Sequence, residues 1–156
     1  MKSASPLLDM DSIEAQILNL HGFKITQPRF AVLSLLKGIV HPISSQEICD
    51  SIDNQVANQA TIYRIIQSFL EAGIIREVNL RHGHIDYELA RDEDDHHHLV
   101  CVSCGLVENF EECETEKIIK RVLKQTKKFA SIHEHAMELF GICKACTKKN
   151  KKTTHR

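Results

Sequence analysis

Two Cys-x-x-Cys pairs constrain the fold of this 156-residue chain more than any other feature. Cys101 pairs with Cys104 and Cys143 with Cys146, and 38 residues separate the two pairs. Four thiolates are the ligand set of a closed, tetrahedral zinc site, which both pairs can share only if the fold brings them together. The sequence therefore predicts one structural Zn²⁺ held by these cysteines. A redox pair and two independent sites are the alternatives, although a redox pair is typical of a βαβ context that the flanking sequence lacks.

Histidine and acidic residues next to the first pair supply further metal ligands. The run from Asp95 to His98 reads Asp-His-His-His, and residues 133–135 read His-Glu-His. Side chains of an extended segment alternate between two faces, which places His96 and His98 on one face and Asp95 and His97 on the other. Nitrogen and oxygen ligands without thiolate suit iron, manganese or zinc. We therefore expect an exchangeable metal besides the structural one, with a solvated polar turn as the alternative.

The first 90 residues have the pattern of several helices followed by a two-stranded ribbon. Apolar residues recur at helical spacing, and Thr26, Ser44 and Asn58 are suitable helix caps. Helices are expected over residues 11–20, 26–38, 44–52 and 58–72, and strands over residues 74–80 and 84–89. This order is typical of a winged helix-turn-helix, in which residues 58–72 form the recognition helix. A helical domain whose surface has no partner is the alternative.

The second half of the chain mixes strands and helix. Strands are expected over residues 98–102 and 106–110, a helix over residues 115–129, and strand-like alternation over residues 130–140, with His133 and His135 on one face. Cys49, outside the two pairs, is expected in the core of the first half.

These patterns predict an α+β fold in two domains. The N-terminal winged helix-turn-helix domain is expected over residues 1–90 and the C-terminal α/β domain over residues 96–147. The charged residues 91–95 are typical of a hinge, and the basic residues 148–156 of a flexible tail.

Composition indicates the compartment and limits the partners. No apolar run approaches the roughly 20 residues that span a bilayer, and the N-terminus lacks the apolar core of a signal peptide. We expect a cytoplasmic protein without a membrane partner, in which six cysteines are metal ligands more often than disulfides. Residues 1–90 carry 7 Lys and Arg against 10 Asp and Glu, a net charge of −3. Affinity for DNA would therefore depend on a few placed cations or on two copies of the domain.

Four segments together resemble the ferric uptake regulator family of bacterial metal-responsive repressors. They are Thr-Gln-Pro-Arg at residues 26–29, Ala-Thr-Ile-Tyr-Arg at residues 60–64, the His-rich segment 96–105 and the segment 135–146. The resemblance extends from residue 21 to residue 146. It implies a homodimer that binds a double-stranded DNA operator, an AT-rich inverted repeat, through its winged helices and dimerises through its C-terminal α/β domain.

The resemblance also implies four sets of site residues. DNA is contacted by Lys24, Thr61, Tyr63 and Arg64. The structural zinc is held by Cys101, Cys104, Cys143 and Cys146. A sensor site at the hinge takes His41, Glu88, His96 and His98, and a second site takes Asp95, His97, Glu116 and His135. Since the sensor ligands come from both domains, the ion favours one relative orientation of the domains, the one that fits both half-sites.

Three departures from the family's usual pattern affect these sets. Asp95 and His97 exchange the usual ligand types, one additional residue lies between Glu88 and His98, and Asn109 stands where an acidic residue often joins the sensor site. Peroxide sensors of the family usually have Asp at that position. Zinc sensors usually carry a Cys near the end of the wing, which is absent here. Fe²⁺ is therefore the expected regulatory metal, followed by Mn²⁺, with a zinc or peroxide response as alternatives.

An enzyme and a metal buffer are the two other classes of function that a metal-binding chain of this kind could have. An enzyme is not expected, because the His-Glu-His at residues 133–135 is not an HExxH motif and no Pro precedes either cysteine pair. A metal buffer without DNA binding stays open, since the net charge of the chain is −1.

Overall fold

The computed structural model describes residues 9–81, 83–90, 96–111, 114–133, 135 and 137–153, with side chains up to residue 149. The chain divides into two compact units, Met1–Asp92 and Glu93–Arg156. The expected hinge at residues 91–95 lies outside the described residues. No helix among the described residues is long and apolar enough to cross a bilayer.

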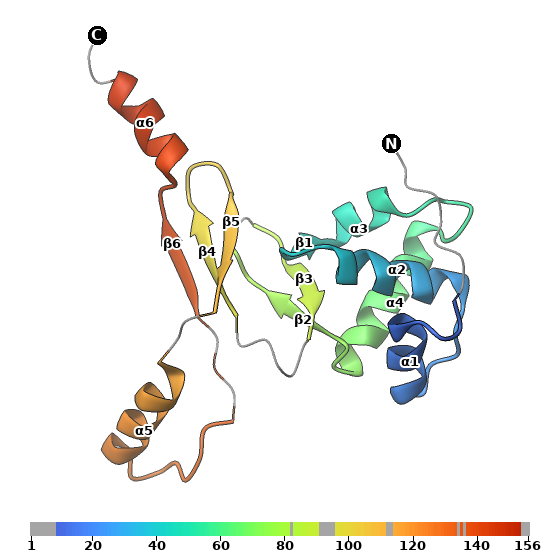
Figure 1. The fold of residues 1–156 in the computed structure, drawn as a ribbon, viewed down its shortest axis with the longest axis horizontal. Coiled ribbons are helices and arrows are strands. Elements are labelled where there is room, and N and C mark those ends of the chain that lie inside the picture. The colour runs from blue at the N-terminus through green and yellow to red at the C-terminus, as the bar shows by residue number, and fades with distance from the viewer. Residues whose placement is uncertain are drawn as a thin grey trace. The chain divides into compact units, whose positions relative to one another are not determined.

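The N-terminal unit contains four helices and a small antiparallel sheet (Figure 1). Its elements are α1 (Ile13–Leu20), α2 (Gln27–Gly38), β1 (Ile43–Ser44), α3 (Ser45–Ser51), α4 (Gln59–Glu71), β2 (Ile75–Val78) and β3 (Asp86–Leu89). The strand order is β1-β3-β2, which places β3 at the centre of the sheet. The last three of these helices, α2, α3 and α4, followed by the ribbon of β2 and β3, match the winged helix-turn-helix that the sequence predicts.

Side-chain caps explain where the helices of this unit begin. The Ser44 hydroxyl accepts from the Glu47 N–H at 3.2 Å, and the Ser44 N–H donates to the Glu47 carboxylate at 2.8 Å, which completes a capping box. The Ser44 hydroxyl also donates to this carboxylate, at 2.7 Å, and the bonds from the Ser44 N–H and hydroxyl lower the pKa of Glu47. Asn58 accepts from the Thr61 N–H at 2.9 Å and starts α4. Thr26 precedes α2 without a side-chain cap, and Pro28 lies in the first turn, where its missing N–H breaks no helical bond.

The core of the unit lies where the apolar faces of its helices meet. Its largest fully buried side chains include Phe69, Leu18, Leu33, Ile48 and Ile62. The Phe69 ring packs edge-on against Phe23, with ring centroids 5.5 Å apart. Cys49 lies in this core, as the sequence predicts, and burial raises the pKa of its thiol. Because α4 supplies four buried residues, the core fixes the orientation of its outer face.

The wing differs in two respects from the ribbon that the sequence predicts. Its strands are shorter, and Arg81 at φ +60° and Gly83 at φ +87° take left-handed conformations in the turn. A third strand, β1, pairs with β3 through Ile43 and Tyr87. A strand of two residues has no periodicity to detect, so only tertiary pairing reveals it.

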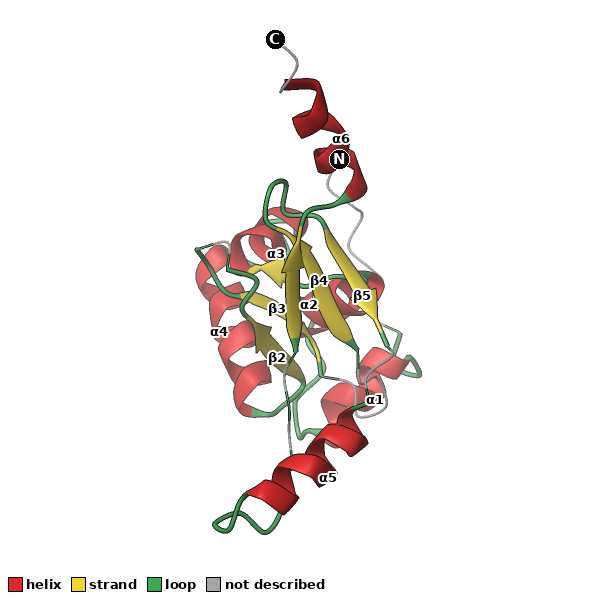
Figure 2. Cartoon of the chain, turned by 90° about the vertical axis from the view of Figure 1, so that its left-hand side faces the viewer, coloured by secondary structure: helices red, strands yellow, loops and turns green. Residues whose placement is uncertain are grey.

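The C-terminal unit is built on a second, mixed sheet (Figure 2). Its elements are β4 (His97–Cys101), β5 (Val107–Phe110), α5 (Thr115–Gln125), β6 (Glu138–Gly141) and α6 (Lys144–Thr153). The strand order is β5-β4-β6, with β5 antiparallel and β6 parallel to β4. Helices α5 and α6 stand at opposite ends of this sheet in both views.

Two expectations for this unit need correction. The alternation over residues 130–140 gives a strand only from Glu138, so His133 and His135 do not share one face of a strand. The expected flexible tail overlaps α6, whose backbone is helical to Thr153. Lysine is a good helix former, and the second cysteine pair starts this helix.

Replacing Phe69 with Ala is expected to destabilise the N-terminal unit by about 3–5 kcal/mol, because the substitution leaves a large cavity in a packed core. Chemical denaturation followed by circular dichroism measures the change. Tyr63→Ala on the outer face of the same helix is the control, with an expected change within about 0.5 kcal/mol. Equal losses in the two variants would contradict the assignment of the inner and outer faces of α4.

Candidate metal centre and DNA-binding helix

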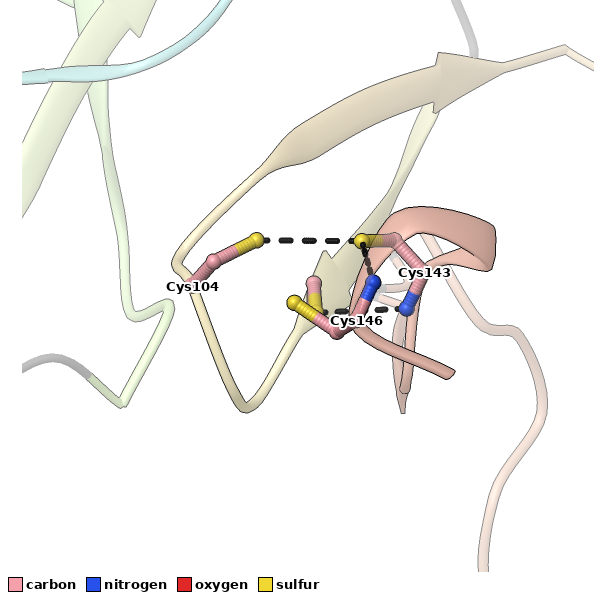
Figure 3. Close-up of side chains that lie close together, drawn as sticks. Cys104, Cys143 and Cys146 are labelled. Atoms are coloured by element: carbon pink, nitrogen blue, oxygen red, sulfur yellow. Dashed lines mark hydrogen bonds between the residues drawn. The ribbon is translucent and has the colours of Figure 1, made fainter. Parts of the chain in front are cut away.

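The four cysteines of the two pairs converge in the C-terminal unit. Cys101 ends β4, Cys104 follows in the turn before β5, Cys143 directly precedes α6, and Cys146 lies in its first turn (Figure 3). All four sulfur atoms lie within 4.8 Å of one another, and those of Cys104 and Cys143 are 3.8 Å apart. A tetrahedron with Zn–S bonds of about 2.3 Å has sulfur atoms about 3.8 Å apart. The cluster therefore fits a structural zinc ion.

Backbone N–H groups support the thiolates of this cluster. The Cys143 N–H donates to the Cys101 sulfur at 3.2 Å, and the Cys146 N–H donates to the Cys143 sulfur at 3.4 Å. The Cys143 N–H is the main reason why the pKa of Cys101 falls to about 6. A backbone bond at Leu106 favours the Cys104 thiolate, but the neighbouring thiols outweigh it and raise the pKa of Cys104 to about 12. A bound dication would favour the deprotonated form of each of these thiols.

The histidines at residues 96–98, at the start of β4, separate onto two faces, as the alternation predicts. The rings of His96 and His98 lie together, with centroids 5.2 Å apart. His97 contacts His135 instead, with 3.4 Å between their Nε2 atoms, and Phe110 packs beside it. Asn109 pairs with His98 in the antiparallel register of β4 and β5. Two histidine pairs are thus available for nitrogen ligation.

Only part of the expected second site comes together. His97 and His135 meet, while Asp95 lies outside the described residues. Glu116 on α5 pairs with Lys120 at 3.1 Å, and its side chain is 87% exposed. Within the described part of the chain, no third ligand lies close enough to this histidine pair to form a three-residue cluster. Thr115, which the sequence analysis missed, has its hydroxyl 3.1 Å from the Nε2 of His135.

The expected sensor ligands divide between the two units. His96 and His98 belong to the C-terminal unit, and His41 and Glu88 to the N-terminal unit. The Glu88 carboxylate on β3 accepts from the Arg76 Nε at 2.6 Å. The Nδ1 of His41 lies 3.2 Å from the carbonyl oxygen of Pro42.

The outer face of α4 carries the residues expected to contact DNA. Tyr63 is 43% exposed, Arg64 is also exposed, and Thr61 is half-buried beside the Asn58 cap. The Nε2 of Gln59 donates to the Tyr63 hydroxyl at 3.5 Å. This face combines a cation with hydrogen-bonding groups, which suits phosphate and base-edge contacts.

Lys24 is held near this helix by contacts that sequence reasoning missed. The Arg29 side chain donates to the Lys24 carbonyl oxygen at 3.1 Å and lies over the Phe23 ring, 5.0 Å from its centroid. Phe23 in turn packs on Phe69 of α4. Arg29, in the Thr-Gln-Pro-Arg segment, is the residue of the sequence that could have indicated these contacts.

A winged helix-turn-helix joined to a unit with a four-cysteine cluster and paired histidines defines a metal-binding regulator of transcription. The sequence model of the ferric uptake regulator family matches residues 20–140. This chain therefore belongs to the ferric uptake regulator family, whose members are metal-dependent regulators of transcription rather than enzymes.

Individual relatives agree with this family over most of the chain. The ferric uptake regulation protein of Legionella pneumophila is 35% identical over 138 residues, which cover 85% of this chain and 98% of that protein. The structure of the ferric uptake regulator from Francisella tularensis with iron aligns with a TM-score of 0.68 and 29% identity, over 81% of this chain and 96% of that chain. The Helicobacter pylori regulator, whose structure reveals three functional metal-binding sites, aligns with a TM-score of 0.70 and 27% identity, over 85% and 88% of the two chains.

Cys101→Ser is expected to lose the structural zinc and unfold the C-terminal unit, because three thiolates no longer close the tetrahedron. Zinc content by mass spectrometry and far-ultraviolet circular dichroism measure the two effects. Cys49→Ser, which changes a cysteine of the other unit, is the control and keeps its zinc. A Cys101→Ser protein that retains one zinc ion per chain would contradict the shared site.

Zinc affinity is expected to fall as the pH falls from 8 to 6. Zinc binds thiolates, whereas the pKa of about 12 keeps Cys104 protonated in the metal-free protein. For each proton that zinc displaces from a thiol, the zinc affinity falls by up to about tenfold when the pH falls by one unit. Because the pKa of Cys101 is about 6, this residue contributes only near the lower end of the range. Competition with a chromophoric chelator measures the slope, and an affinity independent of pH would contradict thiolate ligation.

Proposed function

We propose that this protein is an iron-responsive repressor that binds its DNA operator as a homodimer in the cytoplasm. The observation that carries the proposal is the separation of two kinds of ligand. The four cysteines form one closed cluster, and His96, His97 and His98 remain outside it. Thiolates suit a permanent zinc ion, whereas imidazole and carboxylate suit an ion that exchanges.

The regulatory ion is assigned to His41, Glu88, His96 and His98. Two ligands come from each unit, so a bound ion restricts how the units are oriented. If that orientation matches the spacing of two half-sites, the metal raises DNA affinity by population shift. To move the equilibrium from 1:99 to 99:1, the ion must bind the DNA-competent state about 10⁴-fold more tightly.

Iron is the proposed ion because of both the ligand types and the relatives. The four ligands include no thiolate, which leaves Fe²⁺, Mn²⁺ and Zn²⁺ as suitable ions. The Legionella pneumophila relative is named a ferric uptake regulation protein, and the Francisella tularensis structure contains iron. A second ion at His97 and His135 is also proposed, with Asp95 and Glu116 completing the set after Glu116 leaves Lys120.

A second copy of the chain is the proposed cover for the apolar surface of the C-terminal unit. Helix α5 has no buried residue, although Ile118 and Val122 form an apolar stripe at helical spacing. Leu99 and Leu139 on the sheet are 41% and 46% exposed. A homodimer would bury this surface and present two recognition helices to an AT-rich inverted repeat. Each helix carries Thr61, Tyr63 and Arg64, and Lys24 lies before α2 of the same unit.

Fluorescence anisotropy with an AT-rich inverted-repeat duplex tests the proposal. The zinc-loaded dimer is stripped of exchangeable metal and titrated anaerobically with Fe²⁺, Mn²⁺ or Zn²⁺ at fixed salt. Fe²⁺ is expected to induce tight operator binding. His96→Ala with His98→Ala should remove the metal response but leave the fold intact.

Variants of the recognition helix separate DNA binding from metal binding. Tyr63→Ala with Arg64→Ala is expected to weaken operator binding by more than about tenfold while zinc content and dimerisation persist. Lys37→Gln, which removes a cation from α2, is the matched control and retains operator binding. If no ion induces binding and selection from random DNA also recovers no duplex, the protein is a metal buffer rather than a repressor.

A further inference from the structure

An ion pair in the wing involves a proposed ligand of the regulatory metal. Arg76 on β2 lies directly opposite Glu88 on β3 in the antiparallel register. The Arg76 Nε donates to the Glu88 Oε1 at 2.6 Å. The Glu88 side chain is 9% exposed, whereas the Arg76 side chain is 43% exposed. One partner of this pair is thus buried, and the other reaches solvent.

The burial of Glu88 makes a cationic partner necessary. A buried carboxylate without a counter-ion is strongly unfavourable, and removing one member of a buried pair leaves an uncompensated charge. Asp86 lies two residues away on the same face of β3, and its carboxylate lies 3.2 Å from the Nε2 of His84. Each acidic side chain of β3 therefore has a basic neighbour of its own.

We propose that Arg76 and the regulatory metal are alternative counter-ions for Glu88, so that Arg76 sets the metal concentration at which the protein responds. This inference rests on the assignment of Glu88 as a ligand in the proposed function. The guanidinium already occupies one carboxylate oxygen. A divalent ion on the same carboxylate must therefore displace a monovalent cation or be bound against its repulsion.

The exposure of Arg76 makes the exchange feasible. Its guanidinium can leave Glu88 for water without burying a charge, since the side chain is already partly solvated. The counter-ion of the Glu88 carboxylate then changes from a monovalent guanidinium to a divalent metal ion. The carboxylate keeps a cationic partner throughout. In this scheme Arg76 is a positioning residue, because it acts on the metal only through Glu88.

Metal affinity and thermal stability, measured together, test this scheme. Mn²⁺ is the probe, because it does not oxidise in air on the timescale of calorimetry, and the protein is the full-length, zinc-loaded chain. Arg76→Gln is expected to bind Mn²⁺ about tenfold more tightly than the unmodified protein. Its metal-free form should melt at a lower temperature, and Mn²⁺ should raise that temperature by more than in the unmodified protein. Arg76→Lys keeps the charge and should restore both values.

A matched control separates this role from general stabilisation. Lys37 pairs with Glu14 at 3.1 Å in the same unit, and its side chain is 36% exposed. Lys37→Gln removes a comparable cation from a carboxylate that is not a proposed ligand. It should lower the melting temperature equally with and without Mn²⁺ and leave the Mn²⁺ affinity unchanged.

Glu88→Gln distinguishes failure of the inference from failure of the ligand assignment. If Glu88→Gln weakens Mn²⁺ binding while Arg76→Gln binds Mn²⁺ no more tightly than the unmodified protein, Glu88 is a ligand and the exchange with Arg76 is wrong. If Glu88→Gln binds Mn²⁺ as the unmodified protein does, Glu88 is not a ligand. That outcome overturns both the inference and this part of the proposed function.

Discussion

The attraction between four clustered thiolates and one divalent cation is the interaction on which the C-terminal unit depends. Among the described residues of this unit, Val100 is the only fully buried aliphatic side chain, and α5 contributes none. A small unit with so little apolar core needs another source of stability. The cluster supplies it by joining the turn after β4 to the start of α6, which fixes β4 and β6 side by side. The apolar stripe of α5 is exposed, and a second copy of the chain is its proposed cover.

The N-terminal unit is stabilised in a different way, and this difference allows it to present a rigid surface. Apolar faces of its helices bury Phe69, Leu33 and Ile62, and polar caps fix where the helices begin. The recognition helix is therefore oriented by packing that needs no metal. Loss of the zinc ion destabilises the C-terminal unit. The stability of that unit can therefore change while the DNA-binding surface of the N-terminal unit stays folded.

Local signals in the sequence predicted most of the N-terminal unit and both cysteine pairs. The Ser44 and Asn58 caps lie where short-range hydrogen bonding places them, because such bonds depend only on neighbouring residues. Tertiary pairing could not be anticipated in the same way. Strand β1 has two residues, and β6 pairs in parallel with a strand far away in the chain. The alternation before Glu138 resembles a strand, but no strand pairs with those residues of the segment that the structure describes.

Glu88, a proposed ligand of the regulatory metal, is connected to the recognition helix through a short path inside one unit. Glu88 lies on the central strand β3, which pairs with β1, and Ser44 at the end of β1 caps α3. Helix α3 packs against α4 through the common core. Close packing of this kind resists continuous deformation, so a ligand that pulls on Glu88 moves the unit as a whole more easily than it bends α4. We therefore expect the metal to act by restricting the relative orientation of the units, while the DNA-binding surface of α4 keeps its conformation.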